Sequence, residues 1–286
     1  MLKRVALGSL ILVVIGCVSG ALLVFGWMID ETHFDRPSAD FDILATEIKS
    51  LTGVGDVDKE RWVEAPAFSR PTSWMSVTVT EAGAPALLEA ACSTAYRDPV
   101  SWSVHIETSM GAEVSVHADP TDPNASERES RCPDFGFDAV RLAAALNRVA
   151  PGLSVQPARW ENDRFALVVL DEVMPAGFTE VLPLVEHAGE LIVAAGLPSD
   201  TDVEINTMNL GFVLQPDESD RYVALLTELA ERHEVSSYWA DSGGTPIDGI
   251  EKVQVVAPPG HEEAIEDLIR SSRLHIADLP VRFIEQ

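Results

Sequence analysis

The longest run of apolar positions lies near the start of the chain. Residues 5–29 contain only Gly, Ser and Cys besides apolar side chains. As an α-helix this run would extend about 37 Å, which is enough to cross a hydrocarbon layer of about 30 Å with some tilt. The pattern therefore predicts an N-terminal transmembrane helix at residues 5–29.

Charged residues on either side of this run predict its orientation. Lys3 and Arg4 precede it, whereas Asp30 and Glu31 follow it. Positive charge stays on the cytoplasmic side of a membrane. We therefore expect residues 1–4 inside the cell and the remainder outside the cytoplasm, as the ectodomain of a single-pass protein of the cell membrane.

Two alternative interpretations of the same run are a cleaved signal and a lipoprotein signal. A cleaved secretory signal has an apolar region of about 7 to 15 residues, which is shorter than this run. Residues 14–17, Val-Ile-Gly-Cys, resemble a bacterial lipobox, in which Cys17 would be lipidated, but the residues after Cys17 stay apolar. All three interpretations place most of the chain outside the cytoplasm.

Residues 30–72 form a juxtamembrane region with its own pattern. An amphipathic helix is predicted from Asp40, because apolar residues recur at helical spacing as far as Leu51. A strand is expected at residues 57–63. A linker with a proline at each end follows at residues 66–71.

From Trp74 onward a strand–helix–strand pattern recurs five times. In each unit a short strand-like segment precedes apolar residues at helical spacing, and a second short strand follows. The five units are expected at residues 75–106, 113–160, 165–207, 210–239 and 253–284. The third helix, at residues 178–195, must accommodate Pro183.

Connections between the predicted strands alternate between short turns and helices. This order favours an α+β fold of repeated β-α-β units that form ferredoxin-like antiparallel sheets with helices on one face. We group residues 73–160 as one ferredoxin-like module and residues 161–286 as a second, larger module of β-α-β repeats. Pairing the second unit with the third is an open alternative.

The chain is strongly acidic. From Asp30 onward it has 18 Lys and Arg against 46 Asp and Glu, a net charge of −28. This charge disfavours nucleic acid and anionic lipid surfaces as ligands, because both are bound by clustered cations. Apolar residues remain frequent between the charges, which indicates a folded domain rather than a disordered acidic segment. The expected partners are cations, a basic protein surface, or nothing charged at all.

Two cysteines lie outside the apolar run. In an oxidising compartment Cys92 and Cys132 are expected to form one disulfide. The bond would close a loop of about 40 residues and contribute about 3 to 4 kcal/mol.

One short segment resembles a catalytic motif. Residues 241–246, Asp-Ser-Gly-Gly-Thr-Pro, are similar to the nucleophile segment of trypsin-like serine proteases. That family is an all-β double barrel and needs a catalytic His and Asp in motifs far upstream. Helices interrupt the strands here, and no histidine lies in the expected setting, so a glycine-rich loop is the better interpretation.

Histidines and carboxylates offer metal ligands. His105 and His117 lie on neighbouring predicted strands, and alignment of the apolar faces puts His105 opposite Glu113 with His117 too far away to share a metal. His261 starts a helix but lacks the second histidine of a zincin motif.

A calcium site is a further candidate in the polar loop before Cys132. Asp119, Asp122 and Asn124 have calcium-type oxygens, but their spacing is not that of an EF-hand, and Asp-Pro turns explain them more simply.

Five tryptophans accompany the strands and mainly indicate sheet packing, with an aromatic surface for glycan or peptide as the alternative. They are Trp62, Trp74, Trp102, Trp160 and Trp239.

The sequence thus predicts a membrane-anchored, extracytoplasmic binding or assembly module of the cell envelope, without enzymatic activity or cofactor. Its partners would be the membrane, through residues 5–29, and another envelope protein. The alternatives are an anchored or lipidated ligand-binding receptor, which needs a concave pocket, and a cell-envelope enzyme with a dispersed carboxylate site.

Overall fold

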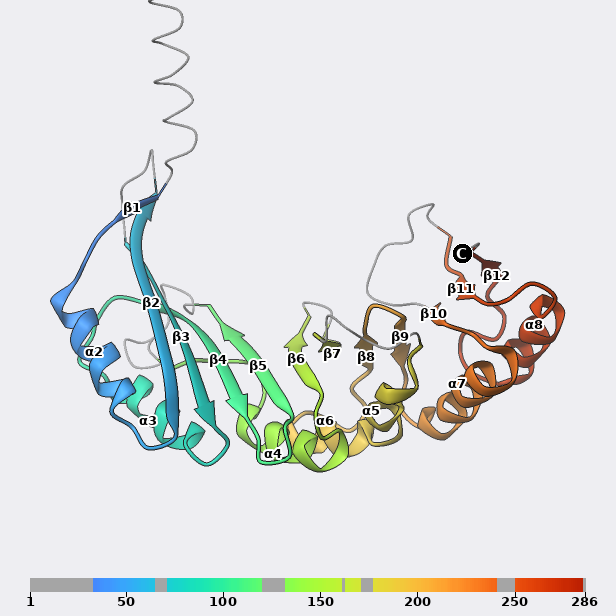
Figure 1. Ribbon diagram of the computed structural model, residues 1–286, viewed down its shortest axis with the longest axis horizontal. Coiled ribbons are helices and arrows are strands. Elements are labelled where there is room, and N and C mark those ends of the chain that lie inside the picture. The colour runs from blue at the N-terminus through green and yellow to red at the C-terminus, as the bar shows by residue number, and fades with distance from the viewer. Residues whose placement is uncertain are drawn as a thin grey trace, which may run out of the picture.

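The strands of this protein form one continuous curved sheet. The computed structural model describes residues 33–64, 71–119, 132–160, 163–170, 177–240 and 250–284. Within these residues, twelve strands lie in the sheet in the same order as in the sequence. The sheet bends into an arc whose outer side carries the helices, and its other face, called the inner face below, lines the inside of the arc (Figure 1).

The elements are β1 (His33–Asp35), α2 (Ala39–Lys49), β2 (Val54–Glu64), β3 (Thr72–Thr80), α3 (Ala84–Ser93), β4 (Val100–Glu107), β5 (Glu113–Ala118), α4 (Ala139–Val149), β6 (Ser154–Arg159), β7 (Phe165–Val169), the 3₁₀ turn η1 (Thr179–Val181), α5 (Leu182–Glu186), α6 (Ala188–Ala194), β8 (Val203–Asn206), β9 (Leu210–Leu214), α7 (Ser219–His233), β10 (Ser237–Ala240), β11 (Val253–Val256), α8 (Glu262–Ser271) and β12 (Val281–Phe283).

From β2 to β12, antiparallel and parallel strand pairs alternate regularly along the sheet. Strands β3 and β4 are parallel and joined through α3, whereas β4 and β5 form an antiparallel hairpin. The same alternation continues to the parallel pair of β11 and β12. Each strand–helix–strand unit therefore contributes two neighbouring parallel strands, and hairpins join successive units.

The predicted ferredoxin-like arrangement is wrong. In that arrangement a strand of one unit is inserted between two strands of another. Here the two strands of every unit are direct neighbours, and the sheet is mixed rather than antiparallel. The protein is nevertheless α+β, and its five units lie where the sequence placed them. The two modules proposed at residues 73–160 and 161–286 lie in the same sheet, joined by the hairpin of β6 and β7.

The fold prediction is also corrected with respect to the membrane helix. Among the residues that the structure describes, no helix is long and apolar enough to cross a membrane. The predicted span at residues 5–29, which includes Cys17, lies outside the described residues.

Alternation along the strands builds the core between the sheet and the helices. In β3, Met75, Val77 and Val79 are buried against the helices, whereas Ser76 and Thr78 lie on the inner face. Buried apolar side chains from all five units form one continuous cluster. Each unit thus completes the core of its neighbours, as in repeat proteins.

The third helix differs from its prediction because of Pro183. Proline lacks a backbone N–H and clashes with the preceding turn of a continuous helix, but it suits the first turn of a new one. The segment accordingly divides into η1, α5 and α6, with Pro183 in the first turn of α5.

A half-buried arginine joins the N-terminal end of the sheet to the first unit. Arg61 of β2 donates to the hydroxyl of Tyr96 over 3.1 Å and to the carboxylate of Asp98 over 2.7 Å. It also donates to the carbonyl oxygen of Arg36 over 2.7 Å, close to β1. Burial raises the pKa of the Tyr96 hydroxyl, although its hydrogen bonds with a serine and with Arg61 oppose this effect.

The structure confirms the predicted disulfide. Cys92, near the end of α3, is joined to Cys132, and their Cα atoms lie 4.3 Å apart. Cys132 precedes α4, so the bond connects α3 of the first unit to the segment before α4 in the second unit. This position stabilises the contact between two successive units of the array.

Candidate functional site

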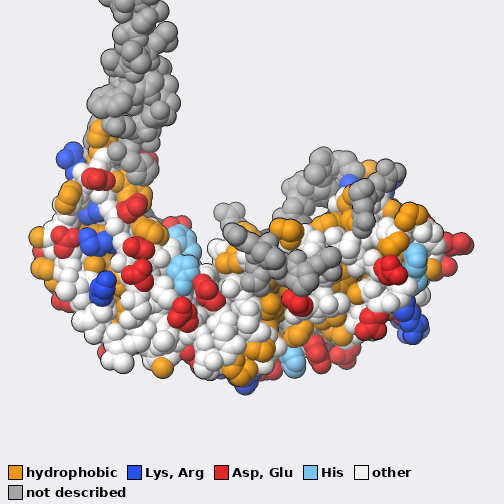
Figure 2. Space-filling model, in the orientation of Figure 1, with side chains coloured by type: hydrophobic (Ala, Val, Ile, Leu, Met, Phe, Trp, Pro, Cys, Tyr) orange, Lys and Arg blue, Asp and Glu red, His pale blue; other side chains and the backbone are white. Residues whose placement is uncertain are grey.

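The candidate site is the inner face of strands β2 to β5, at the N-terminal end of the arc. None of the helices in the described part of the chain covers this face (Figure 1). Strands β3, β4 and β5 contain neither Lys nor Arg. Histidine and acidic side chains gather on this part of the inner face, called the inner wall or simply the wall below. It faces a hollow between the two ends of the arc (Figure 2).

Four side chains on this wall form a continuous chain of hydrogen bonds across three strands. The indole of Trp74 donates to Ser103 Oγ over 3.1 Å, and Ser103 Oγ lies 3.2 Å from His117 Nδ1. His117 Nε2 lies 3.1 Å from Asp119 Oδ1. If Ser103 donates to Nδ1, Nε2 carries the proton and donates to Asp119, so that every polar group in the chain is satisfied.

A second polar group lies beside the first on the same strands. His105 Nδ1 lies 2.9 Å from Ser115 Oγ and 3.3 Å from Glu113 Oε1. Ser115 is the direct cross-strand partner of His105. Such cross-strand hydrogen bonds hold these side chains in fixed positions on the surface.

The order Ser103, His117, Asp119 has the composition of a hydrolase triad, but the surrounding backbone does not support that chemistry. A triad needs free N–H donors to stabilise the oxyanion of the intermediate. Strand β4 is paired with β3 on one side and β5 on the other, so its N–H groups are engaged in the sheet. We therefore interpret the chain as one that orders a binding surface.

The register of β4 and β5 differs from the prediction by two residues. Glu107, not His105, lies opposite Glu113, and His117 lies opposite Ser103. A shift of two residues keeps every side chain on its own face, so the apolar pattern cannot distinguish the two registers. The structure thereby places the two histidines two residues closer along the strands than expected.

Several carboxylates on this wall have no cationic partner within the described ranges. Asp58, Glu60 and Glu107 are exposed and form no ion pair with any residue in the described part of the chain. Glu107 lies directly opposite Glu113, an arrangement of like charges that is unfavourable in a sheet. By contrast, Lys59 and Arg61 of β2 are paired on the outer side with Asp42 and Asp98.

Comparison of the chain with protein families, with curated proteins and with solved structures finds no match in any of the three. Function is therefore inferred from the residues of the site itself.

Tryptophans divide between the two faces of the sheet. Trp102 is buried on the outer, core side, with 2% of its surface exposed. Trp74 lies opposite Glu60 and Trp62 opposite Thr72, so both lie on the inner face. Trp102 therefore has the predicted packing role. Trp62 and Trp74 add aromatic surface beside the exposed carboxylates of the inner face.

Most other predicted site residues do not come together. Asp119 binds His117, whereas Asp122, Asn124 and residues 241–246 lie outside the described residues. Across the described ranges, no group of three or more His, Cys, Asp or Glu is arranged to hold a metal ion. The weak calcium candidate and the glycine-rich loop at residues 241–246 therefore stay predictions from the sequence.

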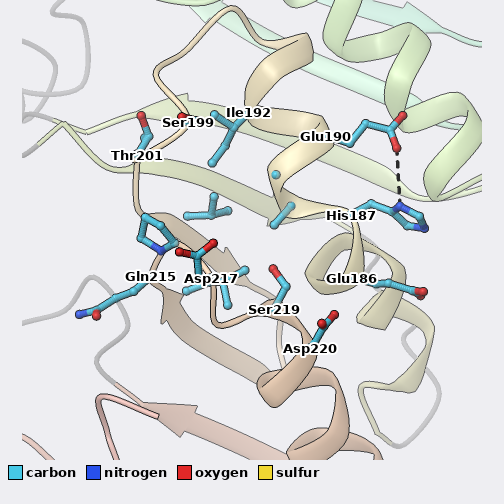
Figure 3. A pocket seen from close by; sticks show the side chains of 15 residues that line it. Glu186, His187, Glu190, Ile192, Ser199, Thr201, Gln215, Asp217, Ser219 and Asp220 are labelled. Atoms are coloured by element: carbon cyan, nitrogen blue, oxygen red, sulfur yellow. Dashed lines mark ion pairs between the residues drawn. The ribbon is translucent and has the colours of Figure 1, made fainter. Parts of the chain in front are cut away.

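A second hollow lies between the third and fourth units. Its volume is about 580 Å³, and it is bounded by α5 and α6, by the loops that flank β8 and β9, and by the first turn of α7. Glu186, Asp217 and Asp220 line it, and a pair of His187 with Glu190, 3.6 Å apart, lies at one side (Figure 3). Sequence reasoning missed this hollow, because its residues come from three separate segments of the chain, 186–192, 199–203 and 214–220.

Proposed function

We propose that this protein is a non-enzymatic binding module that holds a basic segment of another protein against the inner face of β2 to β5. The observation that carries the proposal is the anionic wall on the inner side of a curved, open sheet. Curved repeat arrays present extended concave surfaces of this kind to their ligands.

Charge complementarity identifies the class of partner. Among the described residues no cation pairs with Asp58, Glu60 or Glu107, and the cations of β2 are held on the opposite face. A Lys- or Arg-rich segment laid across the wall would relieve the repulsion between Glu107 and Glu113. The net charge of −26 for the whole chain would also speed the approach of such a partner.

Fixed polar and aromatic groups supply the specificity. Trp62 and Trp74 are half-buried on the inner face, where their rings can contact aliphatic stems or cations. The hydrogen bonds of Ser103, His117 and His105 keep the wall ordered before binding. Less conformational entropy is then lost when a partner binds.

The disulfide supports an oxidising compartment for this module. Such bonds persist mainly outside the cytoplasm. We therefore place the folded part of the chain in the cell envelope or beyond it. Alkylation of thiols in intact cells checks this placement: a protein that reacts at Cys92 and Cys132 without prior reduction was made and kept in a reducing compartment.

The proposal is tested by chemical cross-linking in intact cells, with a matched pair of variants. Glu60→Gln/Glu107→Gln neutralises two carboxylates of the inner wall. Glu47→Gln/Glu89→Gln neutralises two exposed carboxylates on α2 and α3, on the outer side. We expect one partner to cross-link to the wild type and to the outer-side variant, and to be lost from the inner-wall variant.

A purified system makes the same comparison without an unknown partner. Binding of a ten-residue oligolysine peptide to the full chain in mild detergent should weaken about tenfold or more between 50 and 300 mM salt. The inner-wall variant should bind it more weakly than the outer-side variant. Equal binding by both variants would show that only the net charge matters, and the proposed surface would be rejected.

A receptor for a small cationic ligand is the second candidate function, favoured by the hollow between the third and fourth units. Its volume of about 580 Å³ is in the range of small-molecule sites. Asp217 and Asp220 in its lining would attract an amine. A thermal shift with spermidine that disappears in Asp217→Asn/Asp220→Asn, but not in the inner-wall variant, would favour this candidate over the first.

A further inference from the structure

Two histidines meet where α7 ends and α8 begins, far along the chain from the inner-wall site. His233 is the last residue of α7, and His261 directly precedes α8. Both are half-buried, and the two helices contact each other on the outer side of the arc (Figure 1). Twenty-seven residues separate them in the sequence, so their meeting is a product of the fold.

The geometry of the pair is that of two ligands of one metal ion. The Nδ1 atoms lie 3.3 Å apart, and the ring planes are nearly perpendicular, at 86°. Two nitrogens bound to a tetrahedral Zn²⁺ at about 2.0 to 2.1 Å are separated by about 3.3 to 3.4 Å. The two rings therefore need little movement to bind the same ion.

The surroundings of the pair favour a cation. The carbonyl end of α7 carries a partial negative charge next to His233. An open groove of about 600 Å³ beside it is lined by Glu228 and Asp267, among others. Glu262 and Glu263 occupy the first turn of α8, directly after His261.

We propose that His233 and His261 form a binding site for a borderline divalent metal ion such as Zn²⁺ or Ni²⁺, which connects the last two units of the array. Imidazole nitrogen suits these ions, whereas Ca²⁺ and Mg²⁺ prefer oxygen ligands. No third His, Cys, Asp or Glu among the described residues completes a cluster with the pair. In this proposal water fills the remaining positions of the ion.

A direct hydrogen bond is the competing explanation for the short separation. One imidazole could donate its Nδ1–H to the Nδ1 lone pair of the other. In that case the pair needs no ion, and added metal would leave the contact between α7 and α8 unchanged. Metal titration therefore separates the two explanations.

The test is isothermal titration calorimetry of the metal-free full chain, in mild detergent, with ZnCl₂ alone. We expect one equivalent of Zn²⁺ to bind in the micromolar range and to raise the unfolding temperature, with no such effect of CaCl₂ or MgCl₂. His233→Ala and His261→Ala should each weaken binding about tenfold or more. His187→Ala is the matched control and should bind as the wild type does.

Folding of the variants is checked by circular dichroism, and His233→Gln and His261→Gln, which keep more of the side-chain volume, repeat the measurement. Absence of Zn²⁺ binding in the wild type would overturn the proposal. Binding that persists in both alanine variants, or that is lost in His187→Ala, would also overturn it by placing the ion elsewhere. Loss in the His233 and His261 variants alone supports it.

Discussion

Removal of the disulfide is expected to destabilise the N-terminal half of the array strongly. Cys92 and Cys132 are 40 residues apart, and the bond joins α3 to the segment before α4. The double variant Cys92→Ser/Cys132→Ser keeps the size of both side chains. Both residues are only partly buried, so the substitution itself changes little apolar contact.

The expected magnitude follows from chain entropy. Closing a loop of 40 residues lowers the entropy of the unfolded chain by about 13 cal/mol/K, which corresponds to about 4 kcal/mol at 25 °C. At about 2 to 4 °C per kcal/mol for a chain of this size, the first thermal transition should fall by about 8 to 16 °C. The free energy of unfolding should also fall more steeply with urea concentration, because the unfolded chain without the disulfide exposes more surface.

The assay is urea unfolding followed by circular dichroism, for the wild type with and without reductant and for the double variant. Cys17→Ser is introduced into all samples so that a third thiol cannot exchange with the pair. Reduced wild type and the double variant should unfold together. A loss below about 1 kcal/mol, with the bond shown by mass spectrometry to be present in the wild type, would refute the entropic reasoning.

Three further predictions concern packing and pH. Burial raises the pKa of the fully buried Tyr238 phenol, so the folded state holds this proton more tightly than the unfolded state does. The contribution of Tyr238 to stability is therefore complete below pH about 10 and falls as the pH rises further. In thermal unfolding, Tyr238→Phe should lose less stability between pH 9 and 11 than the wild type does. Gly53→Ala should lower the free energy of unfolding in urea by about 2 to 4 kcal/mol, because Gly53 has a φ of +88° and an added Cβ would lie 2.5 Å from Thr80 Oγ1. Gly260→Ala, with a φ of +94° and nothing within 4 Å of the added Cβ, should lower it by only about 1 to 2 kcal/mol. Equal losses would contradict the role of the contact with Thr80. Phe212→Ala should lower the free energy of unfolding by about 3 to 5 kcal/mol, because the ring is fully buried and stacks on a tyrosine at 4.4 Å between ring centroids. A decrease below about 1 kcal/mol would show that this part of the core can rearrange.

The individual units could be predicted from the sequence because each depends on local periodicity. Alternation of Met75, Val77 and Val79 with polar residues marks β3, and the apolar stripe of α4 marks its helix. The short strand β1 was missed, because three residues carry too little pattern. The helical break at Pro183 follows from proline chemistry, but its position depends on how α5 packs.

The order of the strands could not be predicted in this way. A β-α-β unit with neighbouring strands and one that leaves space for an inserted strand have the same hydrophobic pattern. The choice depends on how closely the two strands of each unit approach, which is a property of the packed core. The ferredoxin-like prediction failed for this reason.

The candidate sites show the same division. The sequence by itself determined which residues are apolar, acidic or imidazole-bearing and on which face of a strand each one lies, because the period of a strand is two. Only the tertiary structure decided which of them meet. Asn147 of α4 accepts a hydrogen bond from Met110 N over 2.8 Å and donates one to Ser109 over 3.1 Å, which holds the turn that sets His117 opposite Ser103. Contacts between residues so distant in the chain form only when the helices pack on the sheet, and no local pattern encodes them.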